Sequence, residues 1–93
     1  MAKVIEFTSE GSISPKSTPV RASTPLGVEN NDAVVHSVVW DDGSPDSLIN
    51  ADANGQDIAP DDGVSFDLTG VPPGTWTFHD GHNAETTGQI VVT

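Results

Sequence analysis

The C-terminal residues 74–93 read GTWTFHDGHNAETTGQIVVT and contain two stretches of strand character. In residues 74–80 every second side chain shares a face, which places Trp76, Phe78 and Asp80 on one side of a strand. A short loop with His82 follows, and residues 88–93 form an apolar closing strand. This order predicts a C-terminal pair of β-strands, with a side-chain period of two that can be sought elsewhere in the chain.

The same period recurs toward the N-terminus, and no eleven consecutive residues carry a helical apolar pattern. Each of these further stretches predicts a strand: residues 3–7, 12–14, 25–30, 33–41 and 63–70. The stretch 33–41 (AVVHSVVWD) has apolar side chains on both faces, so we expect a central strand covered on both sides. About seven short strands predict an all-β Greek-key sandwich. Its expected core comprises Val34, Val38, Trp40, Phe66, Leu68, Trp76, Phe78, Ile90 and Val92.

The length of 93 residues predicts a single domain, residues 1–93, with a small core. The chain contains no cysteine, so no disulfide reinforces that core. Residues 41–62 form a long connection, rich in acids and turn formers, with Leu48, Ile49 and Ile58 as apolar anchors. Connections of this length are often functional, so we expect either a solvated loop or a contact surface.

The charge balance is strongly acidic. Fourteen acidic side chains face three basic ones, which gives a formal net charge of −11. This argues against binding to the phosphate backbone of nucleic acids and to anionic membrane surfaces. Two interpretations of the charge stay open: a protein of a halophilic source, where salt screens self-repulsion, or an ordinary acidic domain.

Two further expectations concern localisation. No apolar run approaches the about 20 residues that span a bilayer, so we expect no membrane insertion. Residues 1–10 (MAKVIEFTSE) lack the apolar stretch of a signal peptide. We therefore expect cytoplasmic synthesis, or a mature form from which a leader was trimmed.

The spacing of several residues resembles a known family. Asn30, Asp32 and His36 lie at the spacing that cupredoxins, the plastocyanin- and halocyanin-type copper proteins, show before their first copper ligand. The end of the chain, residues 70–92, resembles the final strands and ligand loop of that family. The resemblance extends over about residues 11–93, and it implies a cupredoxin-like β-sandwich.

The resemblance also implies a degenerate copper site. His36 matches the first histidine ligand, Asp80 stands where the family has its cysteine, and His82 lies near the second histidine. The methionine ligand is missing, and Thr86 and Thr87 occupy its region. Blue copper chemistry requires a thiolate, so at most a His/carboxylate site for Cu(II) or Zn(II) remains.

These residues allow two interpretations. In the preferred one, His36 is partly buried beneath the loop, Asp80 accepts its N–H, and the protein has no cofactor. In the alternative, His36, Asp80 and His82 hold copper or zinc. His79 is expected on the opposite strand face, in solvent.

The functional expectation is a non-catalytic structural module. No Gly-x-Ser-x-Gly elbow is present, and the calcium-like residues 52–57 lack the terminal Glu of an EF-hand loop, so we expect no enzyme. We expect other protein chains as partners in an assembly, such as a capsid decoration or turret protein of a halophile's virus. We expect at least one of two regions to contact another chain: residues 1–7, or the loop residues Leu48, Ile49 and Ile58. The alternative is a cupredoxin-like metal-binding protein with a type-2 copper or zinc site.

The net charge generates a first testable prediction. Compacting a chain of charge −11 brings like charges together, and salt reduces that cost as the Debye length falls from ~30 Å at ~10 mM to ~3 Å at ~1 M. The melting temperature should therefore rise between ~10 mM and ~1 M KCl, as measured by circular dichroism. An unchanged melting temperature would show that charge repulsion does not limit stability.

Overall fold

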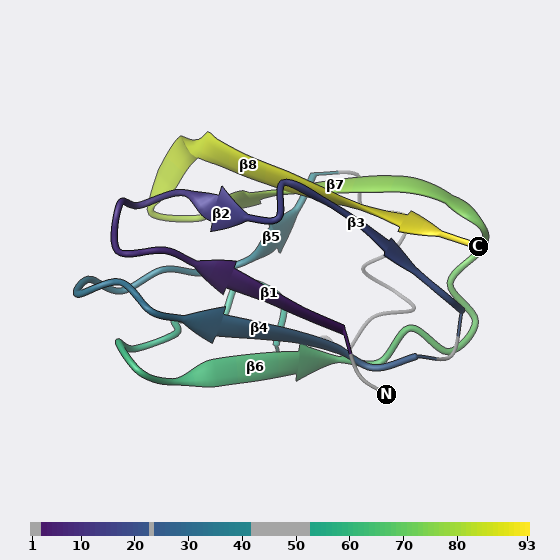
Figure 1. Ribbon diagram of the computed structural model, residues 1–93, viewed down its shortest axis with the longest axis horizontal. Helices are drawn as coiled ribbons and strands as arrows, with labels where there is room; N and C mark the ends of the chain where they lie inside the picture. The colour runs from purple at the N-terminus through teal and green to yellow at the C-terminus, as the bar shows by residue number, and fades with distance from the viewer. Residues whose placement is uncertain (1–2, 23, 42–52) are drawn as a thin grey trace.

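The protein is a sandwich of two four-stranded sheets (Figure 1). The computed structural model describes residues 3–22, 24–41 and 53–93, and in these it contains eight strands and no helix. The strands are β1 (Lys3–Phe7), β2 (Ile13–Ser14), β3 (Ser17–Val20), β4 (Leu26–Asn30), β5 (Val39–Trp40), β6 (Gly63–Phe66), β7 (Gly74–Asp80) and β8 (Asn83–Val92). The predicted all-β class is confirmed. No helix in the described ranges is long and apolar enough to cross a membrane.

Each sheet combines segments that are distant in sequence. The first has the order β2-β1-β4-β6, in which β1 pairs parallel with β4 and β4 antiparallel with β6. The second has the order β3-β8-β7-β5, in which β3 pairs parallel with β8. The chain passes from the first sheet to the second between β2 and β3, and this crossing adds the strand that sequence periodicity did not predict. The antiparallel pair β7–β8 confirms the predicted C-terminal strand pair.

The core lies between the sheets and is aromatic at its centre. Trp40 meets Phe66 and Phe78 edge-on, with ring centroids 5.7 Å and 5.1 Å away, a favoured geometry for aromatic pairs. Seven of the nine predicted core residues are buried: Val38, Trp40, Phe66, Leu68, Phe78, Ile90 and Val92. Trp76 is only half-buried, because its Nε1–H donates to Pro72 O at the surface.

The predicted central strand 33–41 is wrong in its first half. Only Val39–Trp40 forms a strand, and Val34, expected in the core, is 57% exposed. The buried side chain of Asn30 explains the difference, because its Nδ2 donates to Val34 O and to Ile58 O, each at 2.8 Å. These carbonyls are satisfied by a side chain instead of a neighbouring strand, so residues 31–35 bend around Asn30.

The long acidic connection is only partly described. Leu48 and Ile49 lie outside the described residues, as do Met1 and Ala2. Ile58 is buried and pairs through its backbone with His36, so it belongs to the core and is not available as a contact surface. The expectation that Ile58 anchors a partner chain is therefore wrong.

Close packing in the core generates a second prediction. A Cβ on Gly88 would lie 2.7 Å from Cζ of buried Phe78, which is closer than van der Waals contact permits. Gly88→Ala should therefore destabilise the protein by about 1–3 kcal/mol through overpacking, measured by urea unfolding. Thr87→Ala, at the exposed neighbouring position, is the matched control and should change stability by less than about 0.5 kcal/mol. Equal effects of the two substitutions would contradict the packing argument.

Candidate functional site

The site is built around His36, whose buried ring lies between two carboxylates. Its Nδ1–H donates to Asp80 at the end of β7, and its Nε2–H donates to Asp32 Oδ2 at 2.8 Å. The expected contact in which Asp80 accepts an N–H of His36 is confirmed. Ionised carboxylates at both ring nitrogens can only accept, so this geometry favours the imidazolium, which carries a proton on each nitrogen.

Asp80 is completely buried and fully hydrogen-bonded. Its Oδ2 faces His36, and its Oδ1 accepts the backbone N–H groups of Ser37 at 3.1 Å and of His82 at 2.9 Å. Gly81 N–H in turn donates to Ser37 Oγ at 3.0 Å. This approach requires glycine, because a Cβ on Gly81 would lie 2.4 Å from Ser37 Oγ. The contacts fix the turn after β7 against the segment that carries His36.

The surroundings favour the charged form of His36. Burial by itself lowers the pKa of the imidazole, but hydrogen bonds to Asp80 and Asp32, and their charges, outweigh it, so the pKa of His36 is raised. The hydrogen bond from His36 and the N–H of Ala33 lower the pKa of Asp32. Phe7 stacks on the imidazole with ring centroids 4.4 Å apart and planes within 5°, a cation–π contact on the inner side.

The predicted ligand loop is a tight turn. β8 begins at Asn83, which pairs with Asp80, so only Gly81 and His82 separate the two strands. The ring of His82 is half-exposed and its Nε2 is hydrogen-bonded to Asp57 Oδ1 at 2.6 Å. The structure thus joins His36 to Asp80, but it directs the ring of His82 to Asp57.

His79 and Asp41 form a separate pair on the other face of β7. His79 is partly buried, where exposure to solvent was expected, because its Nδ1 is hydrogen-bonded to Asp41. This hydrogen bond lowers the pKa of Asp41. Within the described ranges, neither side chain is hydrogen-bonded to the network around His36, so the pair lies apart from the site.

The donor set decides which metal chemistry fits. The chain has no cysteine and its one methionine is Met1, so the residues do not fit a blue copper centre. In the described parts of the chain, no three His, Asp or Glu side chains are grouped so as to hold a metal ion. What remains at this end is imidazole nitrogen and carboxylate oxygen, which are ligands for Cu(II) or Zn(II).

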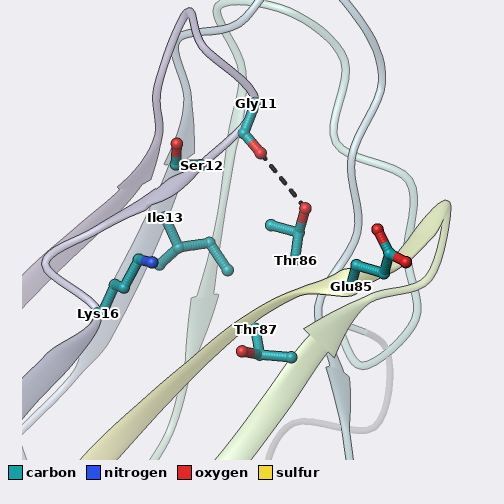
Figure 2. Close-up of a pocket in the computed structure, with 7 residues that line it drawn as sticks. All are labelled: Gly11, Ser12, Ile13, Lys16, Glu85, Thr86 and Thr87. Atoms are coloured by element: carbon teal, nitrogen blue, oxygen red, sulfur yellow. Dashed lines mark hydrogen bonds between the residues drawn. The ribbon is translucent and has the colours of Figure 1, made fainter.

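A polar cleft of about 190 Å³ lies on the flank of the site (Figure 2). Thr86 Oγ1 donates to Gly11 O at 3.3 Å, which ties the turn between β1 and β2 to β8. That turn approaches Asp32, since a Cβ on Gly11 would lie 3.8 Å from Asp32 Oδ2. The cleft is lined by Lys16 and Glu85 with hydroxyl groups and by no histidine, so it is not part of the site.

Three carboxylate partners of the histidines were not identified from sequence, among them Asp41, the partner of His79. Asp32 served only as a spacing marker, although a carboxylate four residues before a histidine was a usable signal. Asp57 is 25 residues from His82, and no sequence pattern joins the two.

The pKa shifts generate a third prediction. Because the folded-state pKa of His36 is raised, its stabilising charge is fully present below about pH 6.5 and is lost as pH rises through the folded value. Because the pKa of Asp32 is lowered from 3.8, its contribution is present above that value and is lost as pH falls through the folded one. Between about pH 4 and pH 6.5 both contributions are therefore present.

Asp32→Asn should lower the pKa of His36 and reduce the loss of stability above about pH 6.5. The measurements are an NMR titration of the His36 Cε1–H resonance and urea unfolding at several pH values, both in EDTA. Asp57→Asn, which removes only the partner of His82, is the matched control and should change neither quantity. An unaltered His36 titration in Asp32→Asn would disprove the assigned cause.

Comparison with known proteins supplies the fold family. No protein-family model and no curated protein sequence matches the chain. Among solved structures, amicyanin from Paracoccus versutus is similar with a TM-score of 0.79 and 12% identity, over 99% of this chain and 81% of the other. A purple cupredoxin from Nitrosopumilus maritimus is similar with a TM-score of 0.76 and 13% identity, over 98% and 99%. The Cu(I) form of a methionine-to-alanine amicyanin variant is similar with a TM-score of 0.77 and 16% identity, over 99% and 82%.

These similarities correct one expectation and confirm another. The expectation of no cofactor is contradicted by these neighbours, which are cupredoxins and include an amicyanin variant in its Cu(I) form. Hydrogen-bonding of His36 and Asp80 does not remove their capacity as ligands, which is why the contact alone was a poor reason to exclude an ion. The predicted cupredoxin-like sandwich is confirmed: this chain has the cupredoxin fold.

Proposed function

We propose that the protein binds a divalent copper or zinc ion through nitrogen and oxygen ligands at the His36 end of the sandwich. The observation that carries the proposal is the direct contact between His36 Nδ1 and the buried carboxylate of Asp80. An imidazole nitrogen and a carboxylate oxygen are thereby held together in the fold of the copper-containing neighbours. His36 and Asp80 are the principal ligands of the proposal, and His82 is the third.

Asp32 prepares His36 for this role. It accepts the Nε2–H of His36, which fixes the orientation of the ring and leaves Nδ1 directed at Asp80. A carboxylate on the distal nitrogen also makes the imidazole a stronger donor. The proton on Nδ1 must leave before that nitrogen can act as a ligand, so binding competes with protonation and releases a proton.

His82 must change its partner. Its backbone N–H already donates to Asp80 Oδ1, so its side chain starts beside the proposed site. Its half-exposed ring has only to exchange the hydrogen bond with Asp57 for the ion. Exposed polar contacts of this kind contribute little to stability, so the exchange costs little.

The ligand chemistry distinguishes this proposal from electron transfer. A bound ion of this type supplies Lewis acidity or simple charge, without the copper–thiolate bond of a blue site. Carboxylate is a hard ligand and favours Cu(II) or Zn(II) over Cu(I). The proposed role is therefore holding a divalent ion without catalysis.

The structural-module interpretation has weaker support. None of the comparisons points to a virion, a capsid or a halophilic source, and the neighbours in structure favour the metal-binding alternative. Assembly with other chains is a separate question, because ion binding at one end leaves the sheet edges available.

The fourth prediction tests ion binding. Titration of the EDTA-treated and dialysed protein with CuSO₄ or ZnCl₂ should give one-to-one binding by calorimetry, with affinity falling as pH drops and His36 is held protonated. The Cu(II) form should show an electron paramagnetic resonance spectrum of nitrogen and oxygen ligands and no intense visible thiolate band.

His36→Ala and Asp80→Asn should each weaken binding by about tenfold or more, which corresponds to at least about 1.4 kcal/mol. His79→Ala removes a histidine of the opposite strand face and is the matched control, with binding unchanged. Circular dichroism confirms that each variant is folded. Equal binding by the wild-type protein and His36→Ala, or no binding above pH 7, would refute the proposal.

A further inference from the structure

β6 is a sheet edge with few of the usual protections. It ends the first sheet, whereas the other edge strands are either two residues long, as β2 and β5 are, or contain a proline, as β3 does at Pro19. β6 has four residues, Gly63–Phe66, and none is proline. Gly63 and Ser65 are exposed, so no described part of the chain covers them (Figure 1).

The register shows which backbone groups of β6 face outward. Asn30 N–H donates to Asp62 O, and the antiparallel ladder then continues with the pairs Val28–Val64 and Leu26–Phe66. Hydrogen-bonded and non-hydrogen-bonded pairs alternate in such a ladder, so the N–H and C=O of Ser65 point away from β4. Gly63 N–H is occupied by Asp62 Oδ1 at 2.8 Å, which leaves Gly63 C=O as a further outward acceptor.

The charges around this edge define what it accepts. An open cleft of about 300 Å³ lies at the start of β6, lined by the carboxylates of Glu29, Asp61 and Asp62 with Asn31. Asp67 follows the strand at the other end and is also exposed. Pairing of β6 with β6 of a second copy would bring the same aspartates together and be repelled, which is a known way to prevent edge-to-edge aggregation, and the chain's own edge strand with basic flanks, β3 between Lys16 and Arg21, contains Pro19. A strand with basic flanks would be attracted instead.

We infer that β6 is a docking edge for an extended segment of a partner protein that has Lys or Arg on both sides of a short β-forming stretch. The segment adds a strand to the first sheet through the outward groups of Ser65 and Gly63. One basic side chain enters the cleft beside Asp61 and Asp62, and another meets Asp67. This interaction goes beyond ion binding and does not involve the His36 network, from which it uses no residue.

The test uses a synthetic peptide, acetyl-Lys-Lys-Thr-Val-Thr-Val-Thr-Lys-Lys-amide, titrated into the EDTA-treated protein at about 20 mM salt. NMR should show the shifts concentrated on residues 61–67, and the exchange of Ser65 N–H with solvent should slow by about tenfold at saturation. A peptide with Glu in place of every Lys should not bind. Raising the salt to about 0.5 M should weaken binding by about tenfold or more.

Two variants separate backbone pairing from charge. Ser65→Pro removes the outward N–H without touching a ladder bond to β4, and it should weaken binding about 3- to 10-fold, the equivalent of one hydrogen bond. Ser65→Ala keeps the N–H and is its matched control, with binding unchanged. The double variant Asp61→Asn/Asp67→Asn preserves the strand, because Asn tolerates the positive φ of 65° at Asp61. It removes two carboxylates beside β6 and should weaken peptide binding by a similar factor. A lysine peptide N-methylated on its threonines provides the same backbone test should Ser65→Pro not fold.

The outcomes decide between occupants. Equal binding to wild-type protein and Ser65→Pro, or shifts outside residues 61–67, would overturn strand addition at β6. Dimerisation in about 1 M KCl that Ser65→Pro abolishes would identify a second copy as the occupant and overturn the basic partner. The peptide experiments are done in EDTA and so do not depend on a bound metal ion. A negative result with the peptide therefore leaves the metal-binding proposal unaffected, and a negative result in the metal titration leaves the docking proposal unaffected.

Discussion

The buried carboxylate of Asp80 needs partners that balance its charge, and the end of the sandwich around His36 supplies them. A carboxylate without partners in the interior would cost several kcal/mol, yet Asp80 has a cation and two backbone N–H groups around it. The cation is His36, which is itself held by Asp32 and by the face of Phe7. Three segments distant in sequence, around Phe7, around His36 and around Asp80, therefore meet at one charge.

That requirement explains the local geometry after β7. The turn at Gly81 and His82 is short because both of its N–H groups are used, one by Ser37 Oγ and one by Asp80. A side chain at Gly81 would collide with Ser37, so glycine permits the close approach. The same short turn leaves the ring of His82 near the surface with Asp57. A longer loop would bring other groups to His36, so the length of this turn limits which ligands an ion can have.

The acidic surface and the sheet edges are connected by the same electrostatics. A net charge of −11 discourages contact between copies of this chain, and it does so most strongly where carboxylates flank an open edge, as at β6. At the other edges, shortness or a proline limits pairing, as in β5 and β3. The proposed strand addition at β6 would combine selectivity for basic partners with protection from pairing between copies, and screening by salt would weaken both.

The sequence by itself determined the all-β class, the C-terminal strand pair and most of the core, because a period of two in residues such as Phe78 and Ile90 is a local signal. It also placed His36 beside Asp80, through the resemblance in spacing to the cupredoxins. Only the tertiary structure decided that Val34 is exposed and outside a strand. The side-chain amide of Asn30 donates to the backbone carbonyl of Val34, which would otherwise pair with a neighbouring strand. The second carboxylate on His36, the pairing of His82 with Asp57 and the open edge at β6 were likewise decided in three dimensions. The period of two in a sequence indicates which face of a strand is buried. The features decided in three dimensions depend instead on hydrogen bonds between residues that are distant in the chain. Such hydrogen bonds leave no regular pattern in a single sequence.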